Sequence, residues 1–183
     1  MESLEILTKN DAETKKVGEI LARDILKSKI EKQALIISLE GELGAGKTTF
    51  TQGFAKGLGV KETPRSPTFV IMQIYNIPPH RPSLLRRGPA TKIHSFTRRG
   101  QGRYFNFVHV DAYRLKSKDF KALNWNDFIK EKRNIILVEW GNKIKNILPK
   151  NSLRIIFKHI GHSHERLIKI KKQKVGKKKD PPG

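Results

Sequence analysis

The sequence has no cysteine among its 183 residues, so disulfides, thiolate zinc sites and cysteine nucleophiles are excluded. It also has no apolar run close to the roughly 18 residues that a membrane-spanning helix needs. The first residues, Met1-Glu2-Ser3-Leu4-Glu5, are acidic and lack the basic-then-apolar pattern of a secretory signal. We therefore expect a cytoplasmic protein that does not associate with membranes.

Acidic residues are scarce: 17 Asp and Glu stand against 38 Lys and Arg, and the net charge is +21. Two segments carry more than half of this excess. Residues 78–104 contribute +7 and residues 169–183 contribute +6. Such segments are commonly solvated loops and tails, but they also suit contact with RNA phosphates or with an acidic protein partner. Charge alone leaves both interpretations open.

Hydrophobic periodicity predicts an alternation of strands and helices. Helical spacing predicts helices over 11–28, 47–58 and 118–131, the last one broken near Asn124. Apolar or alternating runs predict strands over 4–7, 34–39, 69–75, 104–110, 134–139, 153–159 and 166–170, with the last two paired as a hairpin.

This order of elements predicts an α/β fold, a P-loop NTPase-like layered domain. We expect a mostly parallel central sheet with antiparallel additions at the C-terminal end. One domain covers residues 1–170, with a basic surface insertion at about 76–103, and residues 171–183 form a Lys-rich, disordered tail.

The segment Gly41–Thr48 matches the phosphate-binding pattern G-x-x-x-x-G-K-[ST] at every specified position. Glycines let the backbone N–H groups converge on phosphate oxygens, and the helix that follows adds a positive dipole end. Lys47 is expected to reach the β- and γ-phosphates, and the Thr48 hydroxyl to bind Mg²⁺. The predicted ATP-binding residues in this loop are Glu42, Leu43, Gly44, Ala45, Gly46, Lys47, Thr48 and Thr49.

Hydrolysis also needs a carboxylate beside the metal and a group that positions water. Two predicted strands end in an acid, Asp111 and Glu139, and either suits this role. Both are therefore candidate catalytic residues and Mg²⁺ ligands, together with Lys47 as a catalytic residue. His109, on the same strand as Asp111, is interpreted as a packed histidine of the core or its rim.

Four motifs then occur in order: Gly41–Thr49, Ser66-Pro67-Thr68-Phe69, His109–Leu115 and Val138-Glu139-Trp140. Together they resemble the TsaE (YjeE) family of small bacterial P-loop ATPases. The resemblance implies a role in forming N6-threonylcarbamoyladenosine beside the tRNA anticodon, with ATP and Mg²⁺ as cofactors. It also implies TsaD and TsaB as protein partners. The chain would act on tRNA indirectly, or would contact it through the basic segments.

The resemblance further implies roles for individual residues. Thr48 and Glu139 would bind Mg²⁺, and Asp111 would act near the attacking water. Ser66, Pro67 and Thr68 would form a switch that senses the γ-phosphate. Asp11 and Arg166 match positions near the nucleotide.

The sequence departs from the family pattern at three places. Glu42 replaces the usual aspartate, Gly141 replaces the proline that usually follows Glu-Trp, and 76–103 replaces a much shorter connection. Two other functions stay open: a small-molecule or nucleoside kinase with an arginine-bearing lid, and a basic RNA-binding module with a regulatory nucleotide site.

Overall fold

The computed structural model describes residues 2–29, 32–64, 71–79, 106–161 and 164–172. Within these ranges it contains the strands and helices β1 (Glu2–Thr8), α1 (Asp11–Lys27), β2 (Leu35–Glu40), α2 (Lys47–Leu58), β3 (Met72–Asn76), β4 (Asn106–Asp111), η1 (Ser117–Leu123), α3 (Trp125–Lys130), β5 (Asn134–Glu139), η2 (Gly141–Ile144), β6 (Leu153–His159) and β7 (Arg166–Lys172). No helix in these ranges has the length and apolar character needed to cross a membrane.

The strands form one seven-stranded sheet in the order β1-β7-β6-β2-β5-β4-β3. The four central strands β6, β2, β5 and β4 are parallel, which confirms the predicted α/β class. The predicted hairpin is present, because β7 pairs antiparallel with β6. The antiparallel pairing of β3 with β4, at the opposite edge, was not predicted. Strand direction depends on the path between strands, which hydrophobic periodicity does not encode.

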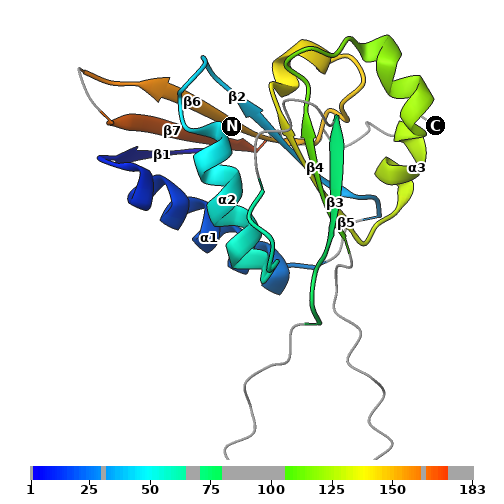
Figure 1. The fold of residues 1–183 in the computed structure, drawn as a ribbon, viewed down its shortest axis with the longest axis horizontal. Helices are drawn as coiled ribbons and strands as arrows, with labels where there is room; N and C mark the ends of the chain where they lie inside the picture. Colours follow the sequence, from blue (N-terminus) through cyan, green and yellow to red (C-terminus); the bar gives the residue numbers. More distant parts are fainter. Residues whose placement is uncertain (1, 30–31, 65–70, 80–105, 162–163, 173–183) are drawn as a thin grey trace, which may run out of the picture.

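Helices cover both faces of the sheet (Figure 1). Side chains alternate along a strand, so Ile37 and Leu39 of β2 belong to the core under α1 and α2. Ile36, one position away, belongs to the core that includes Phe120 and Trp125 from η1 and α3. The burial of all six β5 residues follows from this two-sided cover.

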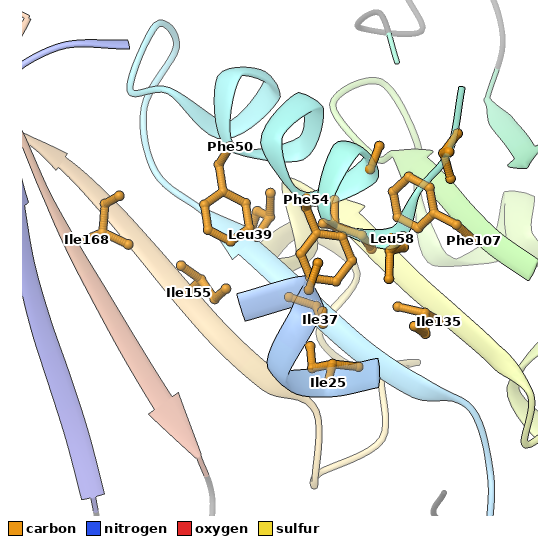
Figure 2. Packing of buried hydrophobic residues seen from close by; sticks show 14 of the residues in the cluster. Ile25, Ile37, Leu39, Phe50, Phe54, Leu58, Phe107, Ile135, Ile155 and Ile168 are labelled. Atoms are coloured by element: carbon orange, nitrogen blue, oxygen red, sulfur yellow. The ribbon is translucent and has the colours of Figure 1, made fainter. Parts of the chain in front are cut away.

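Aromatic rings lie in the middle of the core beneath α2 (Figure 2). Phe50 meets the edge of Phe157 with ring centroids 5.5 Å apart, and Phe54 lies 5.7 Å from Phe107. These contacts tie α2 to β6 on one side and to β4 on the other. The helix that follows the glycine loop is therefore held firmly over the centre of the sheet.

Helices α1 and α2 approach each other at backbone distance because glycines line their contact. A Cβ placed on Gly53 would lie 1.9 Å from the carbonyl oxygen of Lys15. A Cβ on Gly18 would lie 2.4 Å from the carbonyl oxygen of Phe50, and Gly57 is confined in the same way. No larger residue fits at these positions without separating the two helices.

Local signals placed the helix boundaries well. Asn10 caps α1, its side chain accepting a hydrogen bond from the Glu13 N–H at 2.9 Å. Asn124 adopts the left-handed conformation, with φ 50°, and separates η1 from α3 at the predicted break. The left-handed Gly59 ends α2 at the predicted boundary, after Leu58.

Two predicted boundaries need correction. Asn76 is the last residue of β3. Ile77 is 7% exposed and belongs to the core under α1 and α2, so the segment 76–103 does not begin as a surface insertion. Strand β7 continues to Lys172, two residues into the predicted tail. Residues 80–103 and 173–183 of these two segments lie outside the described residues, as does the predicted switch Ser66, Pro67 and Thr68.

Candidate functional site

The glycine loop connects the end of β2 to the first turn of α2. Gly41, Gly44 and Gly46 have φ angles of 145°, 75° and 96°, a region that glycine adopts most readily. The helix then starts at once, since the Phe50 N–H donates to the Gly46 carbonyl at 2.9 Å. The loop thus ends at the first N–H groups of a helix, where anions are favoured.

Lys47 is the cationic centre of the loop. Its side-chain nitrogen Nζ donates to the carbonyl oxygens of Gly41 at 2.9 Å and Glu42 at 2.7 Å. The residue is 5% exposed. Burial lowers the pKa of the Lys47 ammonium, and the nearby carboxylates of Glu139 and Asp111 act in the opposite direction.

Glu139, at the end of β5, contacts the helix that follows the loop. Its Oε2 accepts a hydrogen bond from Thr48 Oγ1 at 2.9 Å, and its Oε1 lies 3.2 Å from Thr51 Oγ1. His109 Nε2 lies 3.0 Å from the same Oε1. Glu139 is 2% exposed, so these groups supply the polar partners that a buried carboxylate requires.

Asp111 lies beside Glu139 but one strand further from the loop. The two acids are partners in the parallel register of β4 and β5, while β5 is the direct neighbour of β2. Asp111 Oδ1 accepts a hydrogen bond from the Tyr113 N–H at 2.9 Å. Of the two strand-terminal acids, Glu139 is the one hydrogen-bonded to Thr48.

Trp140 follows Glu139 in a left-handed conformation, with φ 60°. Lys47 Nζ lies 3.8 Å from the centroid of its ring, a cation–π contact. The Tyr113 ring also packs against the Trp140 ring, with the two centroids 4.9 Å apart. A non-glycine residue in this region carries backbone strain, and such strain is concentrated at functional sites.

Gly141 fits against β2 only because it lacks a side chain. A Cβ there would lie 2.2 Å from Ser38 Oγ and 2.9 Å from Ser38 Cβ. We expect Gly141→Ala to destabilise the protein by about 1–3 kcal/mol in urea unfolding. Ser38→Gly in the same chain should recover part of that loss, because it removes both clashing atoms. Strictly additive effects of the two substitutions would contradict this explanation for Gly141.

Asp11 and Arg166 form an ion pair next to the loop. Arg166 Nη2 lies 3.2 Å from Asp11 Oδ1, and Nη1 donates to the His164 carbonyl oxygen. The Arg166 side chain also closes over the loop, since a Cβ on Gly46 would lie 2.7 Å from its Cδ and Nε. The Nε atom of Arg166 is buried with no hydrogen-bond partner among the described residues.

The rest of the predicted loop residues differ in exposure. Glu42, Leu43 and Gly44 are exposed, and Leu43 is 77% exposed despite its apolar side chain. Ala45 is buried, and Thr49 is half-buried. The loop therefore presents its tip to solvent and its last residues to the core.

Sequence reasoning missed two members of the site. Thr51 lies three residues beyond the end of the motif at Thr48, and its contact with Glu139 depends on how α2 packs over β5. His109 was interpreted as a packed histidine, and it is indeed 0% exposed, but its ring bonds to Glu139. The one available signal was the spacing of His109, two residues before Asp111 and hence on the same face of β4.

Residues 8–85 and 88–168 match the family model described as "Threonylcarbamoyl adenosine biosynthesis protein TsaE". The chain belongs to the TsaE family. It is 30% identical over 167 residues to the tRNA threonylcarbamoyladenosine biosynthesis protein TsaE of Bacillus subtilis (strain 168), covering 91% of this chain and 85% of that protein. The TsaE of Streptomyces coelicolor is 34% identical, over 70% of this chain and 71% of that protein.

A solved structure supports the same assignment. The crystal structure of Bacillus subtilis YdiB superposes with a TM-score of 0.59 at 30% sequence identity, covering 92% of this chain and 84% of that chain. The family indicated by the four sequence motifs is thus confirmed, as is the P-loop architecture of the TsaE fold.

Proposed function

We propose that this chain is the ATP-binding and ATP-hydrolysing subunit that serves threonylcarbamoyl transfer to tRNA, acting with TsaD and TsaB. The observation that carries the proposal is the 2.9 Å hydrogen bond from Thr48 Oγ1 to Glu139 Oε2. It joins the last residue of the phosphate loop to a strand-terminal carboxylate, in a chain whose relatives are named tRNA threonylcarbamoyladenosine biosynthesis proteins. Family membership supports the process, and this contact supports the nucleotide chemistry.

The loop supplies the groups that a triphosphate requires. Its positive-φ glycines and the first turn of α2 offer backbone N–H donors, with Lys47 as the cation between them. The carbonyl oxygens of Gly41 and Glu42 are the present partners of Lys47 Nζ, and phosphate oxygens compete well for the same ammonium because they carry full charge.

The side chains near Thr48 suit a hard divalent cation. The proposed ligands are oxygen donors: one hydroxyl from Thr48 and the carboxylates of Glu139 and Asp111. Mg²⁺ takes one or two carboxylates together with phosphates and water, so this set fits it. When bound, Mg²⁺ would neutralise charge that develops on the phosphates. Thr48 and Glu139 would hold it, and Asp111 would orient the attacking water.

Other residues would complete the nucleotide site. Arg166 lies beside Gly46 and forms an ion pair with Asp11, and both would face the nucleoside side of the ligand. Ser66, Pro67 and Thr68 are proposed as the switch that senses the γ-phosphate, and this role rests on the family resemblance alone.

The deciding experiment is phosphate release from ATP by the full chain, with and without TsaD–TsaB. We expect slow release alone and faster release with the partners. Product analysis separates the alternatives: free phosphate supports the ATPase, whereas a phosphorylated metabolite supports the kinase. Absence of any phosphate release with TsaD–TsaB present would overturn the proposal.

The RNA-binding alternative predicts tRNA affinity that weakens steeply with salt. The matched test replaces the lysines of 173–183 by serine, which leaves β7 intact because that strand ends at Lys172. The RNA-binding module would be favoured if the unmodified chain bound tRNA strongly and in a salt-sensitive way, if this variant lost that binding, and if no ATP hydrolysis were detected.

Glu139→Gln should separate nucleotide binding from turnover. The amide keeps the size of the carboxylate but loses the charge that favours a cation. We expect phosphate release with TsaD–TsaB to fall about 100-fold, while nucleotide affinity measured without Mg²⁺ stays close to that of the unmodified protein. Unchanged turnover would remove Glu139 from the site.

A further inference from the structure

We propose that His109 is a positioning residue: its Nε2–H holds Oε1 of Glu139 so that Oε2 stays directed at Thr48 and at the cation beside it. This inference rests on the proposed nucleotide chemistry, and it assigns a role to a side chain that the proposed mechanism does not use. The relevant contacts are 3.0 Å from His109 Nε2 to Glu139 Oε1 and 2.9 Å from Thr48 Oγ1 to Glu139 Oε2.

Of the two groups that contact Glu139 Oε1, only His109 has a donor proton that is not shared with another acceptor among the described residues. Thr51 Oγ1 lies 3.2 Å from this oxygen but also 2.9 Å from the Lys47 carbonyl oxygen. A hydroxyl has one proton, and the shorter contact is the one to the backbone. An ionised carboxylate can only accept, so His109 Nε2 carries the proton of its contact, and no other acceptor for it is found among the described residues. His109 is therefore the one donor among these groups that is committed to Oε1.

The opposite oxygen has a different task. The Thr48 hydroxyl gives its proton to Glu139 Oε2, which leaves the lone pairs of Thr48 Oγ1 free for a cation. If the carboxylate rotated, this proton would lose its acceptor and the hydroxyl its orientation. By holding Oε1, His109 of β4 thus also fixes the orientation of the Thr48 hydroxyl of α2.

The surroundings of His109 restrain the ring itself. The side chain is 0% exposed and lies parallel to the Phe107 ring, at 6.3 Å between centroids and 4° between planes. Its Nδ1 atom is buried with no hydrogen-bond partner among the described residues. A residue selected for packing alone would not bring an unpaired polar atom into the core, so the bond to Glu139 is the feature that explains a histidine here.

The test uses a matched pair of substitutions. In His109→Gln the amide nitrogen reaches the place of imidazole Nε2 and keeps a donor toward Glu139. In His109→Leu the volume is retained but the donor is lost. His109→Asn gives a third variant, polar like glutamine but too short to reach Glu139. Circular dichroism melts of each variant report whether the chain is folded.

Two readouts separate positioning from packing. The first is the Mg²⁺ concentration that gives half-maximal phosphate release in the presence of TsaD–TsaB. The second is the gain in affinity for a fluorescent ADP analogue when Mg²⁺ is added, which requires no turnover. For His109→Leu and His109→Asn we expect the half-maximal Mg²⁺ concentration to rise about tenfold. We expect Mg²⁺-free nucleotide affinity to stay within about twofold, and His109→Gln to restore the Mg²⁺ response.

The outcomes are distinct. A normal Mg²⁺ response in folded His109→Leu and His109→Asn would overturn the inference, and so would equal defects in all three variants. Loss of Mg²⁺-free nucleotide binding in step with the Mg²⁺ response would also overturn it, because that pattern indicates general damage to the core. Lack of any Mg²⁺ effect in the unmodified protein would instead refute the proposed function.

Discussion

Lys47→Ala is expected to reduce phosphate release from ATP about 100- to 1,000-fold in the presence of TsaD–TsaB. Lys47 is 5% exposed and its ammonium donates to two carbonyl oxygens of the loop, so water screens its charge less than it would screen that of a surface lysine. Alanine removes that charge and also the cation–π contact with Trp140. The measurement is steady-state phosphate release at saturating nucleotide.

The matched control for Lys47→Ala is Lys56→Ala. Lys56 lies on the same helix with a side chain that is 75% exposed, and its ion pair is with Glu19, on α1. We expect turnover within about twofold of the unmodified protein, since Lys56 pairs with Glu19 and Glu19 keeps Arg23 as a partner. Partner-stimulated turnover that survived Lys47→Ala would refute the proposed mechanism.

Gly53→Ala is expected to destabilise the fold by about 3 kcal/mol or more, although alanine is the better helix former. In an isolated helix this change would stabilise by about 1 kcal/mol. Here the added Cβ would lie 1.9 Å from the Lys15 carbonyl oxygen and 2.6 Å from Lys15 Cα, so α1 and α2 must separate. For a chain of this length such a loss lowers the Tm by roughly 6–12 °C, measured by thermal melting.

Asp24→Ala on α1 provides the control for that prediction. Its side chain is 68% exposed and makes a loose ion pair with Lys27 at 3.7 Å, also exposed. We expect a change within about 0.5 kcal/mol. If Gly53→Ala raised the Tm, helix propensity would outweigh the clash, and the close approach of α1 and α2 would be wrong.

Much of the architecture could be predicted from local patterns. The short apolar run before Gly41 and the helical spacing after Lys47 are properties of adjacent residues, and both elements are present with nearly the expected bounds. The break at Asn124 and the hairpin of β6 and β7 have equally local causes. By contrast, the position of Ile77 next to a long basic segment hid its place in the core, and its burial emerged only with the sheet in place.

The sequence by itself determined that a phosphate loop is present and that two strands end in an acid, because each is a run of neighbouring residues. Only the tertiary structure shows how the two acids are placed relative to that loop. The strand order places β5, not β4, beside β2, so Glu139 reaches Thr48 while Asp111 lies one strand further away. The same order brings His109 of β4 against Glu139 of β5, a contact between residues 30 positions apart that no local pattern encodes.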